Sequence, residues 1–190
     1  MKKILLILGH PKSDSFCAAL AGSYAQAARA RGADVRELRL ADLKFNPVLN
    51  VSFRDEQALE PDLAAAQEAI KWADHLVFVY PTWWSGMPAL LKGFIDRVFL
   101  PGFAFRYRKG TIFWDKLLTG RSADVIVTMD TPPFIYRWFM GAPAVKQMKN
   151  GVLGFCGVGP IRVNTLGPIR NADDQRREDW LAQVARLATA

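Results

Sequence analysis

Short apolar runs alternate with amphipathic stretches along the whole chain. Five runs have the length and the valine, isoleucine and leucine content of strands buried on both faces of a sheet. They cover Lys2–Leu8, Val35–Leu40, Leu76–Tyr80, Ala123–Met129 and Ile161–Leu166. Strands that alternate with helices predict an α/β fold, a doubly wound five-stranded parallel sheet in the order 2-1-3-4-5.

Between these runs, apolar residues recur every three or four positions, which is the helical period. The predicted helices cover Cys17–Arg31, Pro61–Trp72, Met87–Phe99, a stretch ending at Cys156, and Asp173–Leu187. The first can be capped by Ser13, Asp14 or Ser15 and is ended by Gly32. The aromatic and basic loop Pro101–Gly110 is too long for a simple turn and is expected to form a small hairpin.

The segment Phe134–Met140 is rich in large apolar side chains outside any strand pattern. It predicts a lid over a ligand or a surface covered by another subunit, with one more turn of core helix as the alternative.

The chain has 190 residues, of which 51% are hydrophobic, so residues 1–190 are expected to form one domain. Its two cysteines, Cys17 and Cys156, are far apart and form no paired motif, which fits a reducing cytoplasm. The apolar run after Met1 ends at Leu8, too early for an export signal, and no run approaches the roughly 18 residues that span a bilayer. The protein is expected to be soluble and not inserted in a membrane.

The net charge of +7 is unevenly distributed, because residues 131–170 contain five basic and no acidic residues. The five are scattered singly, so nucleic acid is not an expected partner. The two histidines, His10 and His75, lack ligand-like spacing to Cys, Asp or Glu, so no metal site is predicted. A GxSxG hydrolase motif is also absent.

Three loops follow predicted strands, and in this topology they open at one edge of the sheet. The turn before Cys17 offers helix-start amides, His10 and the hydroxyls of Ser13 and Ser15 to a phosphate. The loop Pro81–Trp84 offers two tryptophans to a planar ring, although these could also just plug the sheet end. Thr128–Thr131 with Tyr136 would close the other side. A phosphate at one end and a large flat ring at the other describe a flavin.

Three motifs carry a family resemblance. They are His10, Pro11, Ser15 and Phe16; then Tyr80, Pro81, Trp84, Pro88, Ala89, Leu91, Lys92, Gly93, Asp96 and Arg97; then Gly102, Phe103, Ala104 and Phe105. With these motifs the chain resembles the flavodoxin-like NAD(P)H:quinone oxidoreductases over nearly its whole length. The middle motif is long and specific.

The resemblance implies bound FMN or FAD, a homodimer with the flavin near its interface, and ping-pong hydride transfer from NAD(P)H to a quinone. It implies flavin contacts from three groups of residues. These are His10, Ser15, Phe16 and Cys17; Pro81, Thr82, Trp83 and Trp84; and Thr128, Met129 and Asp130. FMN versus FAD, NADH versus NADPH and the natural acceptor stay open, and Arg176 or Arg177 could reach an adenosine phosphate or lie on a solvated helix face.

Tyr136 matches a tyrosine of the family near the flavin, so it is the candidate catalytic residue, with a packed aromatic as the alternative. A family histidine a few residues later is replaced here by Gly141 and Ala142, which puts a proton relay in doubt. Cys17 stands where the family usually has asparagine and is interpreted as a substitution, not a nucleophile. Two other functions stay open: a flavodoxin-type electron carrier, which the basic charge disfavours, and an ancillary flavoprotein that regulates a membrane transporter.

Overall fold

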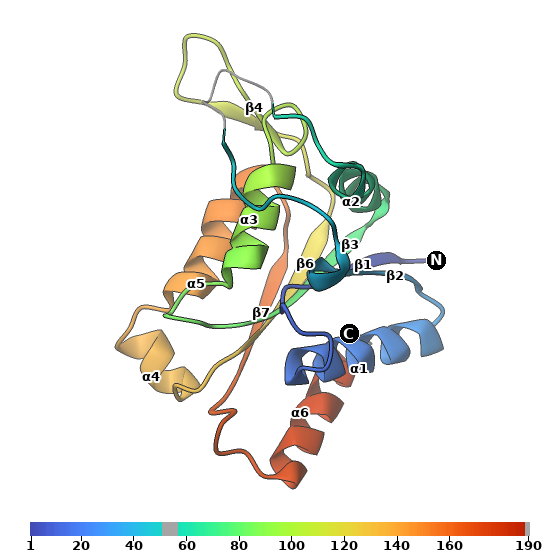
Figure 1. Ribbon diagram of the computed structural model, residues 1–190, viewed down its shortest axis with the longest axis vertical. Helices are drawn as coiled ribbons and strands as arrows, with labels where there is room; N and C mark the ends of the chain where they lie inside the picture. Colours follow the sequence, from blue (N-terminus) through green and yellow to red (C-terminus); the bar gives the residue numbers. More distant parts are fainter. Residues whose placement is uncertain (51–56, 189–190) are drawn as a thin grey trace.

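A parallel five-stranded sheet forms the centre of the protein in the computed structural model, which describes residues 1–50 and 57–188 (Figure 1). The strands lie in the order β2-β1-β3-β6-β7, and every neighbouring pair is parallel. They are β1 (Lys3–Leu8), β2 (Asp34–Arg39), β3 (His75–Pro81), β6 (Ser122–Thr128) and β7 (Ile161–Leu166). The order is the predicted one, and each strand begins and ends within one residue of its predicted bounds.

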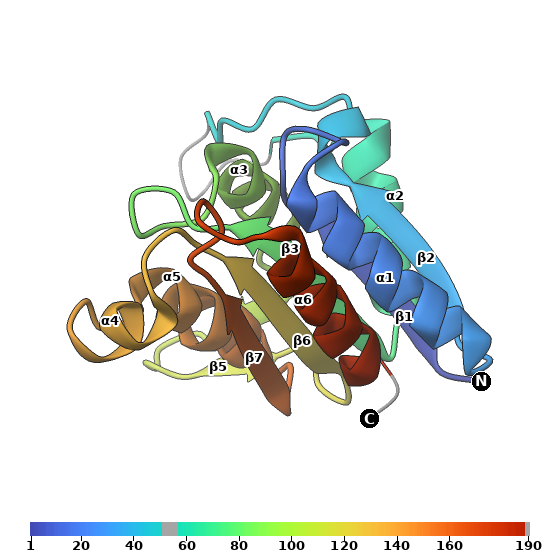
Figure 2. The same ribbon diagram turned by 90° about the horizontal axis from the view of Figure 1, so that it is seen from below.

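Helices cover both faces of the sheet (Figure 2). On one face lie α1 (Phe16–Ala30) and α6 (Asp174–Leu187); on the other lie α2 (Pro61–Trp72), α3 (Ala89–Val98), α5 (Pro143–Lys146) and the π-helix η2 (Gln147–Gly154). Successive side chains of β1 alternate between the two faces, so Leu5 and Ile7 join one hydrophobic cluster while Ile4 and Leu6 join the other. The sheet is therefore buried on both faces, as its unbroken apolar runs predict.

Local sequence explains where two of these helices begin. Ser15 is the N-cap of α1, and its hydroxyl accepts a hydrogen bond from the Ala18 amide at 3.3 Å. Helix α3 begins at Ala89, two residues later than predicted, because Pro88 keeps an extended conformation before it. At Gly93 of α3, a Cβ atom would collide with Pro47, so only glycine lets the loop approach this helix.

The segment between β3 and β7 holds most of the short elements. The predicted hairpin is present as β4 (Phe105–Tyr107) paired with β5 (Trp114–Lys116), so it extends beyond the predicted end at Gly110. The short helix α4 (Pro133–Trp138) follows β6, and a 3-10 helix, η1 (Leu40–Asp42), directly follows β2. Around α4, four large apolar side chains are exposed: Phe134, Trp138, Phe139 and Met140. The core-helix alternative for this segment is therefore wrong for these four residues, although Tyr136 between them is buried.

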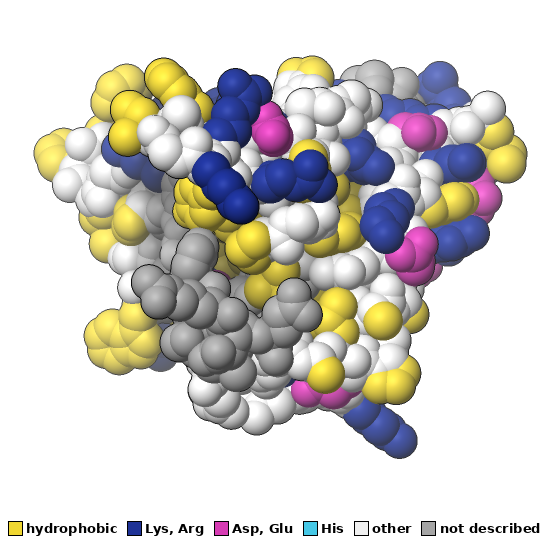
Figure 3. Space-filling model, turned by 90° about the horizontal axis from the view of Figure 1, so that it is seen from above, with side chains coloured by type: hydrophobic (Ala, Val, Ile, Leu, Met, Phe, Trp, Pro, Cys, Tyr) yellow, Lys and Arg dark blue, Asp and Glu magenta, His cyan; other side chains and the backbone are white. Residues whose placement is uncertain are grey.

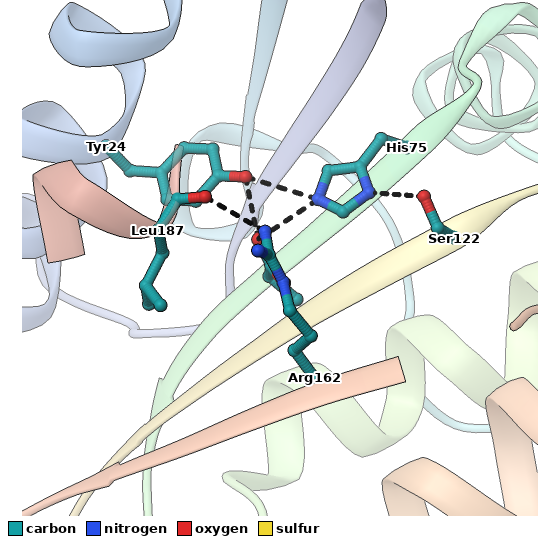
Figure 4. Close-up of polar contacts among 6 residues, drawn as sticks. Tyr24, His75, Ser122, Arg162 and Leu187 are labelled. Atoms are coloured by element: carbon teal, nitrogen blue, oxygen red, sulfur yellow. Dashed lines mark hydrogen bonds and ion pairs between the residues drawn. The ribbon is translucent and has the colours of Figure 1, made fainter. Parts of the chain in front are cut away.

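A buried polar network ties the starts of three strands to the helices α1 and α6 (Figure 4). Both oxygens of the Asp124 carboxylate accept hydrogen bonds from Arg162, at 2.6 and 2.7 Å. One of them also accepts the Tyr24 hydroxyl proton at 2.8 Å and lies 3.1 Å from His75 Nε2. Burial alone would raise the pKa of Asp124, but the bonds from His75, Arg162 and Tyr24 outweigh it and hold that pKa well below the ordinary value.

Arg162 extends this network to the last helix. Its guanidinium donates to the backbone oxygen of Leu187 at 2.9 Å, so the end of α6 is fastened to β7 and, through Asp124, to β6. The network lies at the amino ends of the strands, because Asp124 and Arg162 are near the first residues of β6 and β7. It therefore stabilises the edge of the sheet opposite to the loops that follow the strands.

Candidate functional site

The loops that follow β1, β3, β6 and β7 meet at the carboxyl edge of the sheet and enclose a cavity of about 250 Å³. Its lining residues are His10, Ser15, Phe16, Cys17, Pro81, Thr82, Trp83, Thr128, Met129, Asp130 and Ile169. All the flavin contacts that the family resemblance implies are among them except Trp84, whereas Ser13, Thr131 and Tyr136, which were also predicted at the site, are not in the lining. The structure thus brings the three predicted strand-end loops into one cavity.

One end of the cavity is the amino terminus of α1. Phe16 and Cys17 are its first helical residues and line the cavity, so the positive end of the helix dipole points towards it. Asp14 is exposed to solvent and is not the cap, which removes the conflict between a carboxylate and a bound phosphate. This end of the cavity suits an anion.

His10 lies at the same end of the cavity. Burial lowers the pKa of His10. Its Nδ1 lies 2.9 Å from the Lys12 amide nitrogen and 3.2 Å from the Lys12 carbonyl oxygen, so the backbone of Lys12 holds the ring in place. The edge of the ring also packs against Trp83, with ring centroids 5.7 Å apart.

The loop after β3 forms a tight turn in which Trp83 and Gly86 pair with each other. Trp84 and Ser85 in the middle of this turn have φ angles of 50° and 59°, an unusual conformation for residues other than glycine. Trp83 lines the cavity and is 46% exposed, whereas Trp84 points entirely into solvent. The turn therefore separates the two tryptophans that follow each other in the sequence.

Thr82 carries the most informative polar atom of the cavity. Its backbone amide donates to Thr128 O at 2.7 Å, which joins the ends of β3 and β6. Its hydroxyl oxygen is buried and makes no hydrogen bond of good geometry among the described residues, although it interacts with the Tyr136 hydroxyl and lowers the pKa of that group. Buried polar groups normally have a partner, so this hydroxyl is a candidate for contact with a ligand.

Cys17 and Thr128 close the floor of the cavity. The Cys17 sulfur lies 3.3 Å from the Thr128 hydroxyl oxygen, and burial raises the pKa of the thiol to about 11. The thiol is therefore protonated at neutral pH and is not an activated nucleophile. The sequence-based interpretation of Cys17 as a plain substitution agrees with this environment.

The wall opposite the tryptophan loop comes from the ends of β6 and β7. The Asp130 carboxylate accepts the backbone proton of Arg170 at 2.9 Å, and the Ile169 amide donates to Met129 O at 3.0 Å. At Gly167, a Cβ atom would collide with the Met129 carbonyl oxygen, so this close approach requires glycine. Ile169 was not among the predicted residues, although it follows a fifth parallel strand whose carboxyl end had to lie at the same edge.

Tyr136 lies beside the cavity and not in its lining. Its hydroxyl oxygen accepts the backbone proton of Ala144 at 2.9 Å, and the hydroxyl donates to Ser85 O at 3.4 Å. Burial raises the pKa of Tyr136. The side chain therefore connects the tryptophan loop to the start of α5.

None of the helices in residues 1–50 and 57–188 is long and apolar enough to cross a membrane. Within the same ranges, no group of three or more His, Cys, Asp or Glu side chains could hold a metal ion. Both cysteines are free and buried.

The fold and the position of the cavity define a class of protein. A family model that describes the flavodoxin-like fold matches residues 2–188. The chain therefore belongs to the flavodoxin-like fold family.

Three individual proteins are similar to this chain over nearly its whole length. An uncharacterized NAD(P)H oxidoreductase of Haemophilus influenzae is 29% identical over 191 aligned residues, which cover 98% of this chain and 94% of that protein. The crystal structure of a protein from Streptococcus mutans UA159 has 35% identity and a TM-score of 0.86, and the match covers 98% of both chains. The NAD(P)H:quinone oxidoreductase from Methanothermobacter marburgensis has 25% identity and a TM-score of 0.82, and the match covers 98% of this chain and 95% of that one.

Proposed function

We propose that the cavity binds a flavin and that the protein uses it to transfer two electrons from NAD(P)H to a quinone or a similar acceptor. The observation that carries this proposal is the convergence of the predicted flavin residues on one cavity, with a helix amino terminus at one end and Trp83 in the lining. Relatives that match over nearly their full length are named for NAD(P)H oxidation, and one of them for quinone reduction.

The residues of the cavity fit a flavin in their chemistry. The Phe16 and Cys17 amides and the ring of His10 would bind the phosphate. Pro81 and Trp83 offer flat apolar surface to the ring, and the Thr82 hydroxyl would gain a hydrogen bond. When bound, the flavin supplies the two-electron redox chemistry, and the protein binds and orients it and limits access of water.

Two side chains at this end are compatible with a bound anion. Cys17 is kept protonated by burial, so it adds no negative charge beside the phosphate. His10 lines the same end, and burial lowers its pKa. Neither side chain therefore repels a phosphate by its charge.

We assign Tyr136 a positioning role. The predicted catalytic role needs a hydroxyl that can turn to a substrate or to the cofactor, whereas this hydroxyl bonds Ser85 O and the Ala144 amide. Tyr136 would hold the tryptophan loop against α5 and thereby fix Trp83 at the cavity.

We also propose a homodimer in the cytoplasm. Four exposed apolar side chains around α4, namely Phe134, Trp138, Phe139 and Met140, support this proposal because a second copy could cover them. The Tyr136 contacts link this region to the tryptophan loop, so a dimer formed here would put the partner near the cavity.

The cofactor and the activity can be tested on one preparation. Flavin released from purified protein and identified by mass distinguishes FMN from FAD. Oxidation of NADH and NADPH is then followed with and without a soluble quinone. Quinone-dependent oxidation supports the enzyme, whereas bound flavin without any NAD(P)H oxidation would instead favour an electron carrier, and absence of flavin binding would contradict both.

A further inference from the structure

Asp130 is the only acidic residue among the described residues that line the cavity. Two other lining side chains, His10 and Cys17, can ionise. Burial lowers the pKa of His10 and raises that of Cys17 to about 11, so both favour their uncharged forms at neutral pH. The carboxylate of Asp130 is therefore the one full charge that this lining presents to a bound molecule.

Backbone contacts between the ends of two strands hold this carboxylate in place. Asp130 follows β6, and its Oδ1 accepts the proton of the Arg170 amide, beyond the end of β7, at 2.9 Å. The neighbouring Met129 carbonyl oxygen accepts the Ile169 amide proton at 3.0 Å. These two hydrogen bonds keep Asp130 on the wall of the cavity opposite the tryptophan loop.

The charge of Asp130 is not neutralised by a basic side chain. None of the ion pairs in residues 1–50 and 57–188 includes Asp130, and Arg170 contacts it through the backbone amide. On the face of the molecule drawn in Figure 3, by contrast, Asp and Glu side chains lie beside Lys and Arg side chains. The negative charge of Asp130 therefore acts on a molecule bound in the cavity.

A fixed negative charge beside a flavin ring affects the oxidised and the reduced forms differently. When two electrons and one proton enter the ring, its charge becomes one unit more negative. A neighbouring carboxylate opposes this change, because like charges repel each other. At a separation of roughly 12 Å and an effective dielectric constant of about 20, the repulsion changes the equilibrium by about tenfold.

We propose that the Asp130 carboxylate lowers the reduction potential of the flavin in this cavity. The inference rests on the proposed function, because it needs a flavin whose ring lies between the tryptophan loop and the wall that carries Asp130. A lower potential makes electron transfer to the acceptor more favourable and reduction by NAD(P)H less favourable by the same amount. Asp130 thus sets the balance between the two half-reactions.

The test compares Asp130→Asn with the unchanged protein. The side-chain oxygen of asparagine can still accept the Arg170 amide proton, so the substitution removes the charge and keeps this contact. Affinities for the oxidised and the dithionite-reduced flavin are measured without oxygen, and the midpoint potential is measured separately against a reference dye. Binding of the reduced form relative to the oxidised form should strengthen about tenfold in Asp130→Asn, which raises the midpoint potential of a two-electron couple by about 30 mV.

Two control variants separate the charge of Asp130 from other effects. Asp130→Glu keeps the carboxylate, so its ratio of reduced to oxidised affinity should stay within about twofold of the unchanged protein. Asp62→Asn removes a carboxylate that also accepts a backbone amide proton, from Lys44 at 2.7 Å, but that does not line the cavity. Its affinity ratio should likewise stay within about twofold.

The outcomes distinguish a failure of this inference from a failure of the proposed function. If Asp130→Asn changes the affinities for oxidised and reduced flavin by the same factor or not at all, the carboxylate does not act on the ring and the inference is wrong. It is also wrong if Asp62→Asn shifts the potential as much as Asp130→Asn does. Both results leave flavin binding intact, whereas a protein that binds no flavin would contradict the proposed function and this inference with it.

Discussion

The buried polar groups at the two edges of the sheet differ in whether they have hydrogen-bond partners. At the amino edge, Asp124 accepts hydrogen bonds from Arg162 and Tyr24, and His75 lies between Asp124 and Ser122. At the carboxyl edge, the buried Thr82 hydroxyl makes no hydrogen bond of good geometry among the described residues. The hydrogen bonds of the first edge are complete within the chain, and we propose that a bound flavin completes those of the second.

This difference separates structural from functional residues better than residue type does. A buried Tyr–His–Asp–Arg cluster resembles an active site, yet its groups satisfy one another and it does not border the cavity. Thr82 and Trp83 have less reactive side chains, but one makes no hydrogen bond of good geometry and the other faces solvent beside the cavity. The comparison predicts that mutations at the two edges change different measured quantities.

The largest loss of stability is expected from a mutation at the amino edge. Asp124→Ala leaves Arg162, His75 and Tyr24 without their shared partner, which should lower the free energy of unfolding by about 3–5 kcal/mol. Urea unfolding measures this change. Flavin affinity of the folded fraction should be unaffected.

Asp115→Ala is the matched control, because it also breaks an aspartate–arginine pair, but a solvent-exposed one. Its expected cost is about 0–1 kcal/mol. Equal losses in the two variants would mean that the network adds nothing beyond a surface ion pair.

The next largest loss of stability is expected in acid, which protonates carboxylates that are paired in the folded protein. Hydrogen bonds from the Asn46 amide and from Arg97 lower the pKa of Glu60 from 4.5 to about 2. A carboxyl group with a lowered folded-state pKa stabilises the protein fully above its ordinary pKa, and this stability is lost as the pH falls towards 2. Unfolding free energy measured from pH 6 to 2 should therefore fall below about pH 4.5, and Glu60→Gln should make that fall shallower. An identical pH profile for the variant would contradict the assignment.

Tyr136→Phe should have an intermediate effect at the carboxyl edge. The change removes the hydroxyl that bonds Ser85 O and the Ala144 amide, so we expect a loss of about 1–2 kcal/mol of stability. Weaker flavin binding should accompany it, because the tryptophan loop is released. If kcat and its pH profile change while flavin affinity does not, Tyr136 acts on the substrate and the positioning role is wrong.

Thr82→Val should give the smallest change in stability and the clearest contrast with the amino-edge variant. The substitution removes a buried hydroxyl that makes no hydrogen bond of good geometry, so stability should be unchanged or slightly higher. Flavin affinity should fall about 2- to 10-fold, because one hydrogen bond to the ligand is lost.

Ser23→Ala is the matched control, because it removes a hydroxyl that has a hydrogen-bond partner within the protein. Its hydroxyl donates to Leu181 O at 2.9 Å between α1 and α6, so the variant should lose about 1 kcal/mol of stability and keep its flavin affinity. A Thr82→Val protein that loses stability as Ser23→Ala does would show that the Thr82 hydroxyl has a structural partner.

Much of the fold follows from local sequence. Runs such as Leu76–Tyr80 are too short and too apolar for anything except a strand buried on both faces, and the helices between them leave few topologies. The sheet order then brings the strand-end loops together, so most of the cavity lining could be predicted before any distance was known.

The remainder depends on contacts between distant segments. Ile169 carries no polar group that marks a site, and the direction in which Trp84 points is set by the turn that pairs Trp83 with Gly86. The amino-edge network joins residues from five elements, and its only local sign is a charged Asp124 inside an apolar strand. The Tyr136 hydroxyl could not be placed, since Ser85 and Ala144 are brought to it by the fold.

The most direct test of the carboxyl-edge site is a titration of flavin-stripped protein with FMN and with FAD, followed by flavin fluorescence. Saturable binding of one flavin per chain is predicted for at least one of the two, with weaker binding in Thr82→Val at unchanged stability. If neither flavin binds saturably to the folded protein, the cavity is not a flavin site.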